Sequence, residues 1–224
     1  MAAAALAPAA RAQVAVSVEA DSDDRYRGVS LSDGQPTMSV SAAYDATSGL
    51  YGGVTGTAVA TRHSGVQPLG YVVYAGYAGR LPGGASWDLG ASDSQDLVYL
   101  EDKRYAQNYA ELYAGVSKGD VSAHLYYSPQ YLTDSGAFYA DVDGAWRPAS
   151  GWRLFVHAGV LAVLKDDALA YHGQTRWDAR LGVARQFGRA EARLAWTTTW
   201  PTPVYPPDVR QGRDTLVLSL AWFF

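Results

Sequence analysis

Hydrophobic and polar side chains alternate along the C-terminal stretch TLVLSLAWFF, residues 215–224. Every second residue is large and apolar: Leu216, Leu218, Leu220, Trp222 and Phe224. Successive side chains of a β-strand point to opposite faces, so this period of two predicts a strand with one apolar face.

The same period returns in eleven further segments. The clearest are Thr175–Val183 and Ala190–Trp200, which the Gly188–Arg189 turn joins as a hairpin. The N-terminal predicted strand, Val14–Val29, is long, and we expect a bulge in it near Asp23-Asp24. The remaining predicted strands are Val14–Val29, Met38–Ala46, Tyr51–Thr61, Tyr71–Arg80, Trp87–Val98, Ala110–Ser117, Val121–Ser128, Phe138–Trp146 and Trp152–Leu164.

The connections between these strands alternate in length along the chain. Short turns carrying glycine are predicted at Thr47–Gly49, Pro82–Gly84, Lys118–Asp120, Ala149–Gly151 and Gly188–Arg189. More variable loops lie between them, at Ser30–Pro36, Ser64–Pro68, Glu101–Asn108, Thr133–Gly136, Asp166–Gln174 and Pro201–Arg213. Transmembrane barrels sort their connections in this way, with tight periplasmic turns and longer outer loops.

The polarity of the two strand faces is inverted relative to a soluble protein. The apolar parity is almost free of charge, whereas the other parity carries acids and bases. In a closed barrel the charged parity would line the bore and the apolar parity would face lipid. The predicted pore-lining residues are Glu19, Arg27, Glu111, Asp141, Asp143, Arg153, Arg176, Asp178, Arg180, Glu191 and Arg193.

These patterns together predict an all-β fold: a closed antiparallel up-and-down transmembrane β-barrel of about twelve strands, with ten or fourteen as alternatives. Residues 13–224 would form this single domain. Residues 1–12, MAAAALAPAARA, fit the end of a signal peptide, because Ala10-Arg11-Ala12 matches the small-x-small pattern of a cleavage site. We therefore expect export, with a mature start near Gln13.

Composition excludes several classes of function. The net charge of −4 leaves no basic surface for nucleic acid. The absence of cysteine excludes disulfides, thiolate metal sites and cysteine nucleophiles. No stretch reaches the roughly 18 consecutive apolar residues of a membrane-spanning helix, so a membrane location would depend on strands.

The N-terminal stretch SDDRYRGVSLSDGQP and the later SGLYGG turn resemble the opening of the TorF-type porin family. Asp24 replaces that family's usual aromatic residue, and Leu31 its usual glutamine. The resemblance implies an outer-membrane barrel with a passive transport role. The C-terminal strand similarly resembles the signal by which outer-membrane proteins reach the barrel-assembly machinery. The positions that match the TorF-type family are Arg25, Arg27, Gly28, Val29, Ser30, Ser32, Pro36, Ser48, Gly49, Tyr51 and Gly53.

The predicted function is therefore passive diffusion of small polar or charged solutes through a bacterial outer-membrane channel. Arginines facing carboxylates on neighbouring strands would steer solutes or fill the lumen with salt bridges. We expect a monomer in outer-membrane lipid, with no catalytic residue, no metal, no cofactor and no nucleic-acid partner.

Two alternatives stay open. A barrel hydrolase, such as a protease, phospholipase or lipid A deacylase, would use outer-loop residues; His63 and His172 lie in such loops, the latter with Asp166 and Asp167. The second alternative is a non-conducting structural barrel. His124 and His157 are predicted to face the lumen as polar filling.

Overall fold

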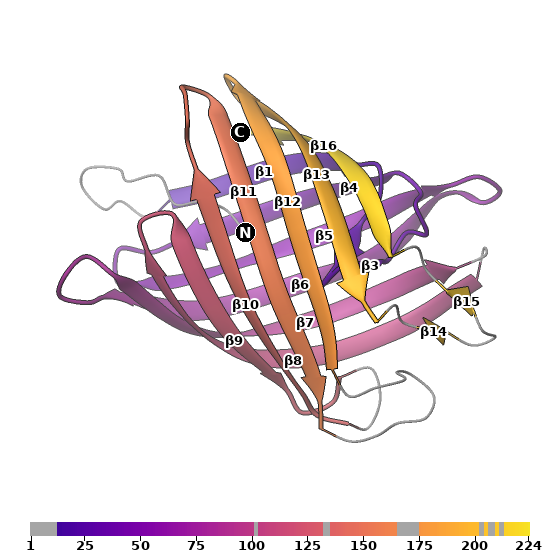
Figure 1. Ribbon diagram of the computed structural model, residues 1–224, viewed down its shortest axis with the longest axis horizontal. Helices are drawn as coiled ribbons and strands as arrows, with labels where there is room; N and C mark the ends of the chain where they lie inside the picture. The colour runs from indigo at the N-terminus through magenta and orange to yellow at the C-terminus, as the bar shows by residue number, and fades with distance from the viewer. Residues whose placement is uncertain are drawn as a thin grey trace.

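The chain folds into one closed antiparallel barrel of twelve strands (Figure 1). The computed structural model describes residues 13–100, 103–131, 135–164, 175–201, 204–205, 209–210 and 213–224. The predicted fold class and strand number are confirmed. The barrel strands are β1 (Gln13–Asp21), β4 (Thr37–Asp45), β5 (Leu50–Thr61), β6 (Gly65–Arg80), β7 (Ser86–Leu100), β8 (Lys103–Lys118), β9 (Val121–Ser128), β10 (Ala137–Trp146), β11 (Trp152–Val163), β12 (Thr175–Phe187), β13 (Ala190–Trp200) and β16 (Asp214–Phe223).

Pairing of the first strand with the last closes the barrel. β1 pairs with β16 on one side, with Ser17 opposite Phe223, and with β4 on the other. Each remaining strand pairs with its neighbours along the chain, which is an up-and-down order. Each barrel strand therefore has a partner on both sides, and the sheet has no open edge.

One end of the barrel carries tight turns, as predicted. The connections at this turn end are residues 46–49, 81–85, 119–120, 147–151 and 188–189. The opposite, loop end carries the variable connections, including a small hairpin of β14 (Val204–Tyr205) and β15 (Val209–Arg210). The Pro201–Arg213 loop and the Thr133–Gly136 loop lie partly outside the described residues, and Asp166–Gln174 lies wholly outside them.

Two predicted loops are largely strand. β6 begins at Gly65 and β8 at Lys103, so the predictions for Ser64–Pro68 and Glu101–Asn108 were wrong. Pro68 suggested a loop because proline cannot donate a ladder hydrogen bond. It is accommodated by a bulge, since the pairing register shifts between Thr57 and Ala58 on β5.

The predicted long first strand was also wrong. β1 ends at Asp21, and the chain then folds into the barrel as a separate hairpin of β2 (Arg25–Tyr26) and β3 (Val29–Ser30). Residues 22–36, called the lumen segment below, join β1 to β4. Several of its side chains are buried, including Asp23 and Arg27. An alternating pattern could not show that this segment leaves the wall and packs inside the barrel.

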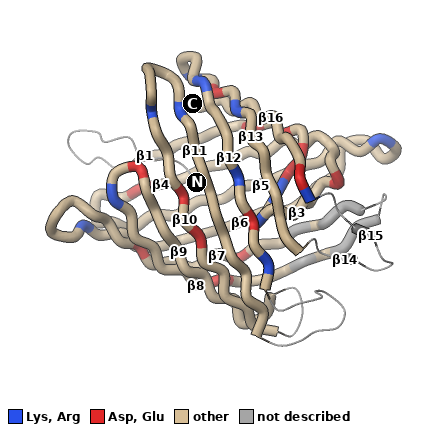
Figure 2. The backbone as a smooth tube through the Cα atoms, in the orientation of Figure 1, with Lys and Arg blue, Asp and Glu red and all other residues tan. Residues whose placement is uncertain are grey.

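The exterior of the barrel is apolar. The strand residues of the apolar parity project outward, and Leu216, Leu218 and Leu220 each expose more than half of their surface. Trp146 lies at the turn end and Trp200 at the loop end, both exposed, as in the aromatic girdles of membrane barrels. Charged residues occur along the strands as well as at their ends (Figure 2). No helix in the described part of the chain is long and apolar enough to cross a membrane.

Glycine on β11 allows large polar groups to meet inside the barrel. Gly159 pairs with Asp141 on β10 and with Asp178 on β12. A Cβ at this position would overlap the hydroxyl of Tyr139 and would lie 2.9 Å from the Asp178 carboxylate. The side chains of β10 and β12 therefore approach one another over a strand position that has no side chain.

Leu218→Arg should destabilise the barrel in a phospholipid bilayer by about 2–4 kcal/mol, because it places a charge on the apolar exterior. Reversible folding into lipid vesicles measures this free energy. Leu218→Ala is the control and should cost less, since it adds no charge. Equal losses for the two variants would contradict a lipid-facing Leu218.

Gly159→Ala should destabilise the barrel by about 1–3 kcal/mol, because the added methyl group displaces Tyr139. Gly56→Ala on β5 is the matched control, since a Cβ there meets no atom within 4 Å. The same vesicle folding assay compares the two. Similar free energies of unfolding for both variants would contradict the close approach.

Candidate functional site

The lumen segment is held together by the carboxylate of Asp23. Arg25 Nε lies 2.7 Å from Asp23 Oδ2. Asp23 Oδ1 accepts hydrogen bonds from the hydroxyls of Ser30 and Ser32 and from the backbone N–H of Gly34. One buried carboxylate therefore ties the two ends of the small hairpin together and gives the segment a defined shape.

The turn of this hairpin places Arg27 in a strained conformation. Arg27 has φ 49° and Gly28 φ 75°, the two positive values that a type I′ hairpin turn requires. Positive φ is unfavourable for a residue with a side chain, and such strain concentrates at functional positions. Arg27 Nη2 donates to both carboxylate oxygens of Glu111 on β8, at 2.9 Å each. The pair is buried, with 4% exposure for each side chain.

Tyrosine rings surround the Arg27 guanidinium. Its central carbon lies 3.9 Å from the ring centre of Tyr139 and 4.7 Å from that of Tyr26. Rings of Tyr126 and Tyr131 lie slightly farther away, at 5.4 Å each. Such contacts stabilise a cation that has lost water. Burial raises the pKa of the Tyr26 hydroxyl well above its ordinary value, so Tyr26 stays neutral and donates to Glu111.

The tip of the hairpin reaches the opposite wall. A Cβ on Gly28 would lie 2.8 Å from Thr199 on β13 and 2.9 Å from Asp178 on β12. Glycine is therefore required at position 28, both for the positive φ angle and for the close approach to Thr199 and Asp178. Since Arg27 contacts β8 while Gly28 contacts β12 and β13, the lumen segment spans the bore. It narrows the passage near the loop end.

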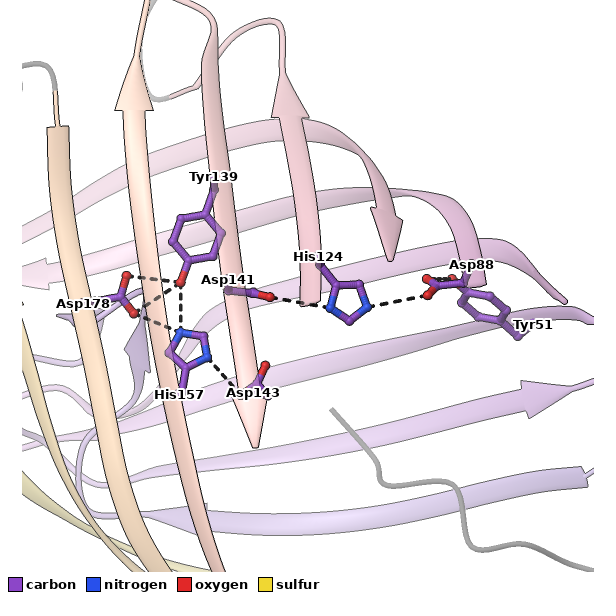
Figure 3. A network of polar contacts seen from close by, with 8 residues as sticks. All are labelled: Tyr51, Asp88, His124, Tyr139, Asp141, Asp143, His157 and Asp178. Atoms are coloured by element: carbon purple, nitrogen blue, oxygen red, sulfur yellow. Dashed lines mark hydrogen bonds and ion pairs between the residues drawn. The ribbon is translucent and has the colours of Figure 1, made fainter. Parts of the chain in front are cut away.

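Four aspartates and two histidines form a polar row on the inner wall (Figure 3). The row begins at Asp178, beside the hairpin tip, and extends toward the turn end of the barrel. His157 lies between two carboxylates: Nδ1 is 3.0 Å from Asp143 and Nε2 is 3.1 Å from Asp178. The hydroxyl of Tyr139 contacts His157 Nε2 at 3.0 Å and donates to Asp178. We call Asp88, His124, Asp141, Asp143, His157 and Asp178 the histidine–carboxylate row.

The second histidine of the row is held less tightly. His124 Nδ1 lies 3.5 Å from Asp141 Oδ1, and His124 Nε2 lies 3.6 Å from Asp88 Oδ1. Among the described residues, neither His124 Nδ1 nor Asp141 Oδ1 makes a hydrogen bond, although both atoms are buried. At the far side, Tyr51 donates to Asp88 at 3.0 Å.

Strand register explains how these residues meet. Asp88, His124, Asp141 and Asp178 lie on one line of register partners across the sheet. Gly115 and Gly159 occupy the two positions on this line where side chains from the flanking strands must meet. Asp178 lies close to the loop end of β12, whereas Asp88 lies close to the turn end of β7. The row therefore slants along the bore. The line of register partners runs Asp88, Gly115, His124, Asp141, Gly159 and Asp178, and Asp143 with His157 forms a nearby register pair of β10 and β11.

A separate group of arginines and glutamates lines another part of the wall. Arg193 on β13 pairs with Glu19 on β1 across β16. Arg153 on β11 pairs with Glu191 at 2.7 Å. These side chains are more accessible than the Arg27–Glu111 pair, with about a quarter of each arginine side chain exposed. They present both signs of charge to water in the lumen.

Nine of the eleven predicted pore-lining residues thus fall into three groups, and Arg176 and Arg180 lie outside them. Arg27 pairs with Glu111; Glu19, Arg153, Glu191 and Arg193 form the accessible group; Asp141, Asp143 and Asp178 contact the histidines. Arg176, Arg180 and Arg193 were expected to form a ladder with Asp178, Glu191, Asp141 and Asp143. Of these pairs, the described ion pairs contain Arg193 with Glu191, at 3.9 Å. Arg180 instead lies exposed as the register partner of His157, and Arg176 is buried on β12.

Several contributors were not predicted. Asp88 lies in the predicted strand Trp87–Val98, where the polar run SDSQD interrupts the apolar face, and Asp23 lay inside the predicted long strand. Tyr139 shares the charged parity of β10 with Asp141, which was a usable signal. Of the hydrolase candidates, His63 lies exposed in the tight β5–β6 turn, and His172, Asp166 and Asp167 lie outside the described residues.

Comparison with solved structures supports the fold. The NanC porin superposes with a TM-score of 0.61 at 9% identity, covering 92% of this chain and 98% of that chain. The KdgM porin gives a TM-score of 0.55 at 8% identity, covering 94% and 99%. KdgM in complex with disordered oligogalacturonate gives 0.53 at the same identity and coverage. At such low identity the similarity is one of fold.

Sequence comparison gives a family. No curated protein sequence matches the chain. The resemblance to the TorF-type porins remains a prediction. Residues 5–217 match the family described as "Bacterial protein of unknown function (Gcw_chp)". Because this match spans nearly the whole chain, the protein belongs to the Gcw_chp family.

Proposed function

We propose that this protein is a narrow outer-membrane channel for passive diffusion of small polar or charged solutes. The observation that carries the proposal is the inverted polarity of a closed barrel: an apolar exterior surrounds an interior lined with ion pairs. Such a barrel is stable in hydrocarbon because every strand is paired and the charged groups face inward. The porin names of the structural neighbours support the same conclusion.

The accessible arginine–glutamate group would contact solutes in transit. Arg153, Arg193 and the exposed Arg180 offer planar donors, and Glu19 and Glu191 offer acceptors. A lumen with both signs of charge can replace part of the hydration of a polar solute. KdgM has been captured with oligogalacturonate, an acidic sugar polymer. For this chain we infer only the broader class of small polar or charged solutes.

The lumen segment would limit the size of those solutes. It crosses the bore from β8 to β12 and β13, and its Arg27–Glu111 pair is buried. Twelve strands enclose a bore between that of small filled barrels and that of open porins. A segment folded into a bore of this width would leave room only for small molecules.

The C-terminal strand would direct insertion into the outer membrane. β16 pairs with both β1 and β13, and therefore completes the barrel. Its outward residues Leu216, Leu218, Leu220, Trp222 and the following Phe224 form the proposed signal for the assembly machinery. The proposed location, the monomeric state and the signal peptide at residues 1–12 belong to the same hypothesis.

Purified barrel reconstituted into a planar phospholipid bilayer should produce discrete current steps that are linear in voltage. The physical reason is a continuous aqueous path beside the lumen segment. Folding must first be established by the heat-dependent gel mobility typical of barrels. A folded barrel that inserts but passes neither ions nor small sugars into liposomes would contradict a channel.

Replacing both members of the constriction pair, as Arg27→Ala with Glu111→Gln, should raise the unitary conductance. The double change avoids leaving one charge buried without its partner. Liposome swelling should then admit larger sugars than the unchanged protein admits. Arg147→Ala with Asp120→Asn, an exposed pair at the turn end, is the matched control and should leave conductance unaltered. Unchanged conductance in the first variant would show that the lumen segment is not the constriction.

A further inference from the structure

We propose that the histidine–carboxylate row contains a binding site for a divalent transition-metal cation, with Zn²⁺ as the probe. The ligands are Nδ1 of His157 and one carboxylate oxygen each from Asp141 and Asp143. The binding itself does not depend on transport, although the position of the cation in an aqueous bore rests on the proposed function.

The three ligand atoms already lie together. Ligand atoms of Asp141, Asp143 and His157 all fall within 4.8 Å of one another. Bound ligands lie about 2.0–2.2 Å from a tetrahedral zinc ion, which places any two of them roughly 3.3 Å apart. His157 Nδ1 and Asp143 Oδ1 are separated by 3.0 Å and need only a small expansion, whereas the set as a whole, which spans up to 4.8 Å, would contract around the ion.

The other nitrogen of His157 is arranged as in known metal sites. A histidine that binds a metal commonly donates its second N–H to a carboxylate, which fixes its tautomer and ring orientation. His157 Nε2 faces Asp178 at 3.1 Å, and Tyr139 donates to the same carboxylate. Asp178 is therefore a positioning residue, and His157 is oriented with Nδ1 toward Asp141 and Asp143.

A second observation points independently to a ligand. The side chain of Asp141 is only 7% exposed, and its Oδ1 receives no hydrogen bond from the described residues. His124 Nδ1, 3.5 Å away, is also buried without a hydrogen bond. Buried polar atoms are normally satisfied, and an unsatisfied one in a polar site suggests a bound ion or water. A cation coordinated by Asp141 would add a shorter interaction than the 3.5 Å contact with His124 provides.

Charge and ligand type favour a transition metal over Mg²⁺ or Ca²⁺. With His124 and His157 neutral, the carboxylates of Asp141, Asp143 and Asp178 carry negative charge that Arg180, the register partner of His157, offsets only in part. A dication would neutralise the remainder. The imidazole nitrogen suits Zn²⁺, Co²⁺, Ni²⁺ or Cu²⁺, whereas Mg²⁺ and Ca²⁺ prefer oxygen ligands alone.

Calorimetric titration of the folded barrel in detergent with ZnCl₂ should show one saturable site with micromolar affinity, and MgCl₂ should give no comparable heat. His157→Ala and Asp143→Asn should each abolish this site. Asp178→Asn should weaken it on the order of tenfold to a hundredfold, as loss of a supporting hydrogen bond does at other metal sites. Heat-dependent gel mobility establishes that each variant is folded.

His63→Ala and Asp120→Asn provide matched controls, because both residues are exposed in turns. They should bind Zn²⁺ as the unchanged protein does. Co²⁺ should give the intense visible absorption of a tetrahedral nitrogen–oxygen site, lost in His157→Ala. Absence of Zn²⁺ binding, or equal binding by a folded Asp143→Asn variant, would overturn the proposal. Either result leaves the conductance experiment unaffected, so the two hypotheses fail separately.

Discussion

Closure of the sheet is the constraint on which the rest of the structure depends. A strand that lacks a partner on one side exposes backbone donors and acceptors, which is costly in hydrocarbon. Pairing of β1 with both β4 and β16 removes that cost for the whole sheet at once. Once closed, the barrel has only two surfaces. The alternating sequence assigns the apolar side chains to the outer surface and leaves the charged side chains to be satisfied inside.

Strand register and the glycine positions, which have no side chain, explain how charged side chains inside the barrel find partners. Strand neighbours place acids beside bases or histidines, and the glycines at 115 and 159 let groups two strands apart touch. The lumen segment adds its own internal support through Asp23, so it does not depend on the wall for its shape. Arg27 then joins it to Glu111 on β8. These charges thus gather in three groups, and in the histidine–carboxylate row Asp141 Oδ1 is buried without a hydrogen bond from the described residues.

Much of the architecture could be predicted from the sequence because a sheet with one apolar and one polar face imposes a strict period of two. The strand number, the hairpin at Gly188–Arg189 and the tight turns at one end follow from that period and from turn residues. The predicted strand bounds were wrong where local chemistry competed with this period. At Pro68, for example, proline suggested a loop, but a bulge keeps the residue in β6. The inward fold of residues 22–36 was missed because alternation cannot distinguish a barrel strand from a hairpin packed inside one. The meeting of His157 with Asp143 and Asp178 depends on register between strands, which no local pattern encodes.

The lumen segment is attached to the wall at one place. Its two ends leave the wall at β1 and β4, which pair directly and therefore stand only about 4.8 Å apart. So narrow an attachment does not by itself fix where the rest of the segment lies in the bore. Its position therefore depends on the contact of Arg27 with Glu111 and on the packing of Gly28 against β12 and β13.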